Sequence, residues 1–308
     1  MRRYLFWAVV IALLVLLPPV TVALGQGFYI DLVRRIMIFA IAAVSLNLIL
    51  GYGGLVSFGH AAYLGIGGYA VAIFAFYGVN SGFLQWGTAI VASALVALAI
   101  GAVSIRTSGV YFIMITLAFT QMLYYLGISI EEYGGDDGIR LKARSQFPLI
   151  DLSDGVQFYY LVLALMLGSV YLVHRIVNSR FGMVLRATRS NEARSRAVGF
   201  SPYMYRLTAF VIAGAIGGLS GALLANHTNF LTPDYMHWTR SGEIMFMVIL
   251  GGMGTSAGPL LGSFALLLVE DLLSHWTEHW QVYLGPLLVL AVLFFKRGLA
   301  GVFERSRD

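Results

Sequence analysis

The sequence predicts an all-α, polytopic integral membrane protein with about 8–10 transmembrane helices and with glycine-rich broken or re-entrant segments. Composition is the first reason, because 59% of the 308 residues are hydrophobic and only 11% are charged. The second reason is the mean hydropathy of +0.80. The third is a series of apolar segments about 20 residues long. There is no cysteine, so disulfides and thiolate metal sites are excluded and helix packing must hold the protein together.

Ten apolar segments approach the length that crosses a bilayer. They lie near residues 4–24, 32–50, 59–79, 86–105, 109–129, 157–177, 207–226, 240–253, 258–275 and 281–297. The first segment follows Arg2 and Arg3, as in signal peptides, but it continues past Pro18 and Pro19, so we expect a retained helix. The segments are expected to form a single transmembrane domain over residues 1–308.

Charge fixes the expected orientation. Residues 175–206 carry seven arginines and one acid, Glu192, and short basic loops resist translocation. The arginine-rich loop, about residues 178–206, is therefore expected in the cytosol. Ten crossings also place both termini there, and the protein in a bacterial or archaeal cytoplasmic (inner) membrane.

The acidic loop, about residues 130–156, is then extracytoplasmic. Two details fit this orientation badly: Arg34 and Arg35 fall on the outer side, and the span near 240–253 contains Arg240 and Glu243. The formal net charge of +5 comes mostly from residues near membrane exits. It is explained by orientation and by anionic membrane lipid, and it does not indicate nucleic-acid binding.

Glycine is abundant, with 35 residues, and two uses are expected. In the apolar segment at 213–221, glycines spaced four apart predict a flat strip for tight helix packing. These residues are Gly214, Gly217, Gly218 and Gly221. The packing is expected within the chain or against a partner.

Elsewhere glycines interrupt the hydrophobic pattern, at the first glycine break (residues 51–60) and the second glycine break (residues 251–259). Non-helical backbone at membrane depth occurs only where protein buries it or where it lines a wet cavity. We therefore take these breaks and nearby polar groups as candidates for a solute path, with interfacial turns and interhelical hydrogen bonds as the alternatives. The candidates are Gly54, Ser57, Gly59, His60, Thr116, Thr120, Gln121, Gly252, Gly254 and Thr255.

The arginine-rich loop also has the signals of a short helix. Ser190 or Asn191 is suited to cap it, Glu192 falls in its first turn, and Gly199 is suited to end it. Such a basic helix would lie along the membrane surface. It would serve either for docking or as an orientation signal bound to anionic lipid.

Several stretches resemble one family. They are residues 47–54, 57–62, 134–139, 250–254 and 258–259, and the run from 179 to 210 in the arginine-rich loop. Together they resemble the permease subunits of branched-chain amino acid ABC importers, in particular the LivM-like member. Glu192 precedes Gly199 by seven residues, where the general importer pattern has six.

The resemblance implies an importer permease domain for branched-chain or related amino acids. The implied partners are a second, LivH-like permease, two ATP-binding subunits and an extracytoplasmic solute-binding protein. It also implies that the arginine-rich loop supplies the coupling helix that contacts an ATPase. The matching positions are Arg186, Arg189, Asn191, Glu192, Arg194, Ala197 and Gly199.

An enzyme is not expected. The chain lacks a Gly-x-x-x-x-Gly-Lys-Ser/Thr stretch, and its only lysines are Lys142 and Lys296, so it cannot bind ATP by a P-loop. No cofactor is expected on this chain, and ATP and Mg would bind to the partner subunits.

Two other classes stay open. One is a stand-alone channel or secondary transporter, which is weakened because acidic residues sit mostly near span ends. The other is a membrane zinc metallopeptidase, since His275, Glu278 and His279 match an H-x-x-E-H pattern. Histidine and tryptophan at a membrane exit are more typical of an interfacial belt, so we expect no metal.

Overall fold

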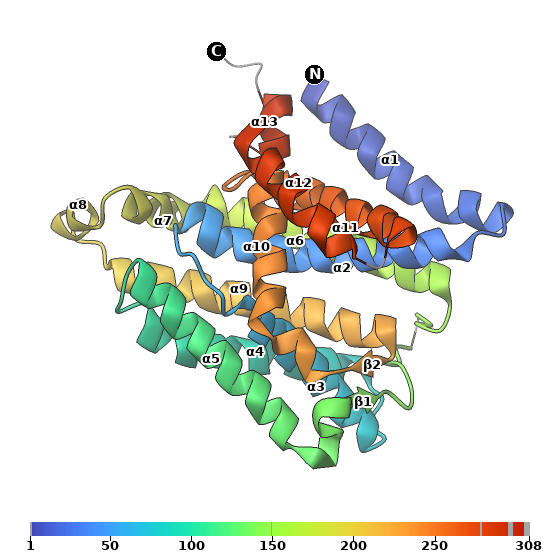
Figure 1. The fold of residues 1–308 in the computed structure, drawn as a ribbon. Helices are drawn as coiled ribbons and strands as arrows, with labels where there is room; N and C mark the ends of the chain where they lie inside the picture. The colour runs from blue at the N-terminus through green and yellow to red at the C-terminus, as the bar shows by residue number, and fades with distance from the viewer. Residues whose placement is uncertain (1, 149, 278, 295–297, 305–308) are drawn as a thin grey trace.

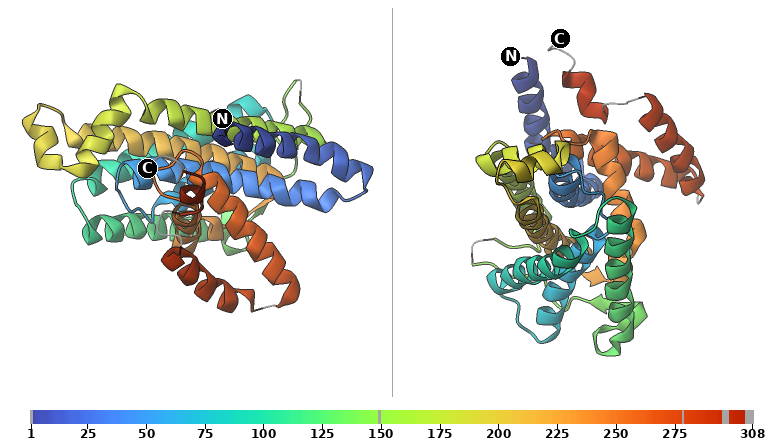
Figure 2. Two further views of the ribbon diagram at one scale, coloured as in Figure 1. Left: turned by 90° about the horizontal axis from the view of Figure 1, so that it is seen from above. Right: turned by 90° about the vertical axis from the view of Figure 1, so that its left-hand side faces the viewer.

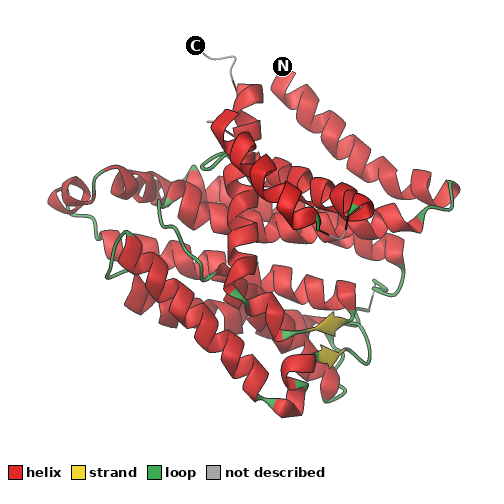
Figure 3. Ribbon diagram, viewed as in Figure 1, coloured by secondary structure: helices red, strands yellow, loops and turns green. Residues whose placement is uncertain are grey.

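The computed structural model describes residues 2–148, 150–277, 279–294 and 298–304, and these are overwhelmingly helical (Figures 1 and 3). Ten helices correspond to the ten apolar segments expected from the sequence. They are α1 (Arg2–Ala23), α2 (Gly27–Asn47), α3 (His60–Phe76), α4 (Gly82–Ser104), α5 (Val110–Ser129), α6 (Gly155–Val177), α9 (Pro202–Thr228), α10 (Trp238–Gly251), α11 (Gly258–Trp276) and α12 (Trp280–Phe294).

Shorter elements join them. They are a π-helix at Leu48–Tyr52, 3-10 turns at Glu131–Tyr133, Gly135–Asp137 and Pro233–Met236, helices α7 (Arg180–Ser190), α8 (Glu192–Ala197) and α13 (Gly298–Glu304), and strands β1 (Ile139–Arg140) and β2 (Phe230–Leu231). The two strands pair antiparallel, with Ile139 opposite Leu231. They connect the acidic loop to the end of α9.

The core of the bundle surrounds α2, whose residues from Ile36 to Asn47 are almost wholly inaccessible to solvent. Helices α6, α9, α10 and α11 pack around α2, and α3 and α4 pack on the far side of α9 (Figures 1 and 2). A helix that is apolar all round is expected in such a buried position. Helix α5 packs loosely at the edge of the bundle.

Five helical segments among the described residues are long and apolar enough to cross a membrane on their own: Gly27–Tyr52, Gly82–Ser104, Val110–Ser129, Gly155–Val177 and Pro202–Thr228. The others are shorter or more polar, α10 having 14 residues and α3 having 17. The protein is therefore an all-α, multi-pass membrane protein. Helices α7 and α8 project at one end of the bundle, and β1 and β2 lie at the opposite end (Figure 1).

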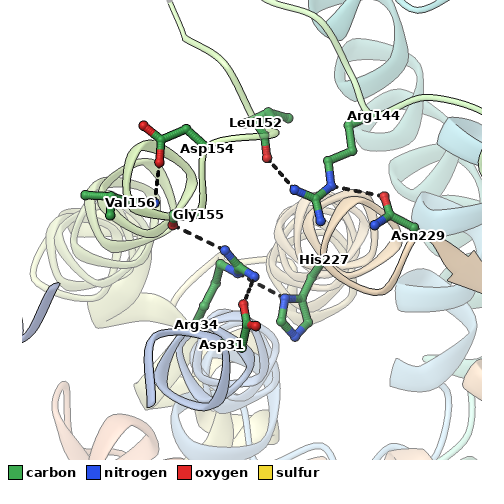
Figure 4. Close-up of polar contacts among 9 residues, drawn as sticks. All are labelled: Asp31, Arg34, Arg144, Leu152, Asp154, Gly155, Val156, His227 and Asn229. Atoms are coloured by element: carbon green, nitrogen blue, oxygen red, sulfur yellow. Dashed lines mark hydrogen bonds and ion pairs between the residues drawn. The ribbon is translucent and has the colours of Figure 1, made fainter. Parts of the chain in front are cut away.

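At the strand end, Arg34 lies 3% exposed inside the bundle. Its Nε donates to His227 Nδ1 at 3.0 Å, its Nη1 donates to the carbonyl of Gly155, and its Nη2 pairs with Asp31 (Figure 4). The guanidinium also lies 4.8 Å from the centre of the Phe158 ring. The neighbouring Arg35 pairs with Glu270 at 3.0 Å. The two arginines that fitted the charge pattern badly are thus both ion-paired, Arg34 inside the bundle and Arg35 at a half-exposed position.

Candidate functional site: two glycine breaks and the arginine-rich loop

The first glycine break turns the chain back into the bundle. Helix α2 widens into the π-helix at Leu48–Tyr52, after which residues 53–59 are non-helical. Helix α3 then begins at His60, whose Nε2 lies 2.6 Å from Ser45 Oγ on α2. Ser45 precedes the end of the π-helix by seven residues, about 10 Å of helix. The break is therefore re-entrant, as expected.

Side chains from two other helices satisfy the backbone of the re-entrant segment. The Phe58 N–H donates to Thr116 Oγ1 at 3.2 Å, and Thr120 Oγ1 donates to the Phe58 carbonyl at 3.1 Å. At the start of α3, the Ala61 N–H donates to Ser241 Oγ of α10 at 2.9 Å. Polar backbone groups that leave a helix at this depth need such partners, because lipid offers none.

The second glycine break joins α10 to α11. Thr255 Oγ1 donates to the Gly252 carbonyl at 2.8 Å and accepts from the Gly258 N–H at 3.0 Å, which fixes a tight turn. Gly252 and Gly254 have φ angles of 117° and 76°, a region that side chains disfavour. The start of α13 packs here too, since a Cβ on Gly298 would overlap the backbone of Gly252.

The two glycine breaks meet. Asn47, near the end of α2, donates from Nδ2 to the Thr255 carbonyl at 2.9 Å and accepts at Oδ1 from the Gly254 N–H at 2.9 Å. Arg189, in the last turn of α7, donates to the carbonyl of Gly51. A Cβ on Gly54 would lie 2.8 Å from Arg189 Cγ. Both breaks and the arginine-rich loop therefore converge at one end of the bundle.

The polar path candidates divide by exposure. Ser57, His60, Thr116 and Thr120 are fully buried. The Ser45 hydroxyl proton is directed to the Ala42 carbonyl, so His60 Nε2 acts as the donor to Ser45. His60 Nδ1 and Gln121 Oε1 are buried and have no hydrogen-bond partner among the described residues. Gly252 is also buried, Gly254 and Thr255 are half-buried, and Gly54 is exposed.

The glycines of α9 form one strip that contacts two other helices. A Cβ on Gly214 or Gly218 would overlap Ala97 or Ser93 of α4. A Cβ on Gly221 would overlap the Leu64 carbonyl of α3, and one on Gly217 would lie 3.2 Å from Tyr63 Cβ. The strip of glycines expected on one helix face therefore contacts two neighbouring helices, α3 and α4, and both belong to this chain.

The arginine-rich loop folds into two short helices. Asn191 Oδ1 accepts from the Arg194 N–H at 2.9 Å and so caps α8. Gly199, with φ 93°, ends α8 in a Schellman arrangement: its N–H donates to the Arg196 carbonyl, and the Phe200 N–H donates to the Ser195 carbonyl. These are the cap and the stop that the sequence indicated.

Glu192 ties α8 to α9. Its two carboxylate oxygens accept from Arg196 at 2.5 Å and from Arg206 at 2.7 Å. Beyond this link, Val198 is 69% exposed and Phe200 is 42% exposed. Arg186, Arg194 and Ala197 are exposed as well. The loop thus presents apolar and basic side chains at the tip of a rigid, capped turn.

The histidine motif is not arranged on one helix. His275 lies in the last turn of α11, Thr277 is extended, and α12 begins after His279. Glu278 lies outside the described residues. Among the described residues, no group of three or more His, Cys, Asp or Glu side chains is placed to hold a metal ion.

Sequence reasoning missed Asn47 as a site residue, although it lies inside a stretch that resembles the family. An amide side chain near the end of an otherwise apolar span was the available signal, because such a group needs a partner inside the protein. The contacts of Arg34 and His227 were missed for a related reason, since their partners come from distant helices.

Comparison with known proteins identifies a family. Residues 28–295 match the family model of the branched-chain amino acid transport system permease component. The permease LivM of the high-affinity branched-chain amino acid transport system of Escherichia coli is 29% identical over 94% of this chain and 73% of its own length.

Two further relatives extend the comparison. The autoinducer 2 import permease LsrC of Yersinia pseudotuberculosis is 27% identical over 72% of this chain and 66% of its length. LivH of Escherichia coli is 22% identical over 85% and 91% of the two chains. No solved structure matches the chain significantly.

Proposed function

The chain belongs to the family of branched-chain amino acid transport system permease components, and from this premise we propose that it is one of two membrane subunits of an ABC importer. The second subunit would be a LivH-like permease, and the two subunits together would form the solute path. Separate ATP-binding subunits would drive transport, with ATP and Mg bound on them. An extracytoplasmic binding protein would deliver the solute.

The observation that carries this proposal is the tip of the arginine-rich loop. Exposed Val198 and Phe200 lie beside exposed arginines on a turn that is capped at both ends and tied to α9 by Glu192. Large apolar side chains held rigidly in water are typical of a protein contact. A loop that served only as an orientation signal would need neither the caps nor the apolar side chains. We assign this tip to an ATPase subunit.

The orientation follows from this assignment. The end of the bundle that carries α7 and α8 would face the cytosol, and the acidic loop with β1 and β2 would face outward. Basic side chains near the cytosolic end would also contact anionic lipid. Both termini would be cytoplasmic, in a bacterial or archaeal inner membrane.

A branched-chain amino acid is the solute we propose, because the relatives named LivM are branched-chain amino acid permeases and match most of this chain. The candidate path groups are those at the two glycine breaks. The N–H groups of Phe58 and Ala61 at the new start of α3 would suit a carboxylate once they were released from Thr116 and Ser241, which accept from them in this conformation.

Affinity purification from the native membrane in mild detergent tests the assembly. We expect two nucleotide-binding subunits and a second permease by mass spectrometry. Phe200→Asp is expected to lose the ATPase subunits while the second permease stays bound. Asn178→Asp, which adds the same charge at an exposed position near the end of α6, serves as the matched control and should retain both. Recovery of the chain alone would favour a stand-alone channel or secondary transporter.

Uptake of labelled leucine by the reconstituted complex tests the solute. We expect ATP-dependent accumulation when the binding protein is present. Competition by unlabelled isoleucine and valine, but not by urea or aromatic acids, would support a branched-chain solute. Competition only by the latter would overturn that assignment and leave the assembly in place.

A further inference from the structure

The end of α2 carries unusual backbone. The π-helix at Leu48–Tyr52 directs the Gly53 N–H to the Leu48 carbonyl and the Leu55 N–H to the Ile49 carbonyl. This offset leaves the Gly51 carbonyl for the Arg189 guanidinium. Short π-helical turns recur at functional sites, and relaxation of such a turn to α-helix would shift the adjoining chain. Here the adjoining chain is the first glycine break.

Asn47 binds the second glycine break as a backbone segment would. It is 1% exposed, and both halves of its amide are used, one donating to Thr255 and one accepting from Gly254. The amide offers a donor and an acceptor in one plane at any pH, which an ionised aspartate of similar size does not. Removal of Asn47 would leave two peptide groups of the second break without these partners.

The contact leaves no space between the two breaks. A Cβ on Gly51 would overlap the Gly254 nitrogen, and a Cβ on Gly254 would lie 3.1 Å from the Gly51 carbonyl oxygen. Arg189 packs over Gly54 from the loop side. The backbones of the two breaks therefore meet directly where α7 joins them, and a solute cannot pass between them in this conformation.

From these contacts we propose that Asn47 closes the cytoplasmic end of the solute path by hydrogen-bonding the second break to α2, and that Arg189 makes this closure respond to the arginine-rich loop. The proposal rests on the proposed function. Movement of α7 would carry Arg189 away from Gly51 and release the π-helical turn. The two hydrogen bonds of Asn47 would then be the contacts that separate. Asn47 and Arg189 are positioning residues, and neither needs to touch the solute.

Cysteine labelling tests the closure directly, because the chain contains no cysteine of its own. Leu55→Cys places a thiol just after Gly54, at a side chain that is 8% exposed. In membrane vesicles with the cytoplasmic face outward, a membrane-impermeant maleimide should label this thiol slowly. We expect Asn47→Ala to raise the labelling rate about tenfold, the scale of one to two lost hydrogen bonds.

Matched controls separate closure from general damage. Asn178→Ala removes an exposed amide, just after α6, that bonds to His174 of that helix, and its labelling rate should equal that of the parent. Asn47→Asp keeps the acceptor for Gly254 and, at a pH at which its carboxyl is ionised, loses the donor to Thr255, so an intermediate rate is expected there. If Asn47→Ala does not fold, the labelling rate of Asn47→Asp still tests the closure. A labelling rate of the Asn47 variant equal to that of Asn178→Ala would overturn the closure.

The link to the loop is tested in the assembled complex. Trapping with a non-hydrolysed ATP analogue should change the labelling rate of Leu55→Cys in the parent and in Arg180→Ala, an exposed arginine at the start of α7. It should change the rate much less in Arg189→Ala. Equal responses in Arg180→Ala and Arg189→Ala would overturn the link. If no ATPase subunit is recovered, the proposed function fails, but the Asn47 comparison in the chain alone still stands.

Discussion

The Glu192 carboxylate on α8 lies 2.7 Å from the Arg206 guanidinium on α9. This pair fixes the tip of the arginine-rich loop to the first turns of a long helix that runs through the core of the bundle. A second pair, with Arg196, orients the carboxylate within α8. We therefore expect motion at the loop tip to be passed to α9.

Glu192→Arg is expected to uncouple uptake from ATP hydrolysis while leaving the protein inserted. The substitution places a third cation beside Arg196 and Arg206, so the loop tip should separate from α9. The pairs are partly exposed, and each contributes only about 0–1 kcal/mol to stability, so folding should persist. Uptake and ATPase activity of the reconstituted complex are the measurements, with Glu131→Arg in the acidic loop as control. Unchanged uptake in Glu192→Arg would count against docking through this loop.

Gly221→Ala is expected to destabilise the fold by about 1–3 kcal/mol, the usual cost of forcing a methyl group into a packed interface. Its Cβ would overlap the Leu64 carbonyl on α3. Gly87→Ala is the matched control, because a Cβ there meets nothing within 4 Å. Thermal unfolding in detergent should show a lower midpoint for Gly221→Ala and an equal or slightly higher one for Gly87→Ala. Equal loss in both would mean that close packing is not the cause.

His60→Phe separates a structural role from a role in the solute path. His60 is fully buried and is hydrogen-bonded to Ser45, so its loss should lower thermal stability by about 1–3 kcal/mol through the missing hydrogen bond and the changed volume. If the residue only supports α3, the KM for leucine should stay the same while the amount of folded complex falls. Ser45→Ala removes the partner and should reproduce the stability loss. A raised KM in His60→Phe alone would indicate solute contact.

The re-entrant first break illustrates what the sequence predicts well. Glycines that interrupt an apolar span indicate non-helical backbone, and the rule that such backbone must be buried places it inside the bundle. The caps of α8 could be predicted from the sequence equally well, because Asn191 and Gly199 act on neighbouring residues. Local chemistry determined both, so no tertiary information was needed.

The contacts between distant segments could not be predicted from local sequence. Asn47 and Gly254 are 207 positions apart, and nothing in either local sequence indicates the other. The spacing of the α9 glycines predicts a strip, but the helices that it contacts depend on where α3 and α4 pack, and periodicity alone does not determine that. The same limit explains Arg34, which fitted the charge pattern badly and proved to be paired with groups on two other helices.

Arg34→Met is expected to weaken the strand end of the bundle more than Arg140→Met does. Arg34 is 3% exposed and joins α2 to His227 of α9 and to the start of α6, whereas Arg140 is an exposed residue of β1. Hydrogen bonds from a charged donor contribute about 1.5–3 kcal/mol each, and methionine retains most of the buried volume. The loss of stability in Arg34→Met should therefore reflect the missing hydrogen bonds rather than a cavity.

Limited proteolysis of the acidic loop and thermal unfolding in detergent measure this effect. We expect faster cleavage between residues 140 and 154 and a lower unfolding midpoint in Arg34→Met. His227→Phe removes the acceptor for Arg34 Nε and should produce part of the same change. Since Arg144 also holds this loop, through Asn229 and the Leu152 carbonyl (Figure 4), the double variant of Arg34 and Arg144 should lose more than either alone. Equal cleavage rates in Arg34→Met and Arg140→Met would show that the buried guanidinium does not hold the acidic loop.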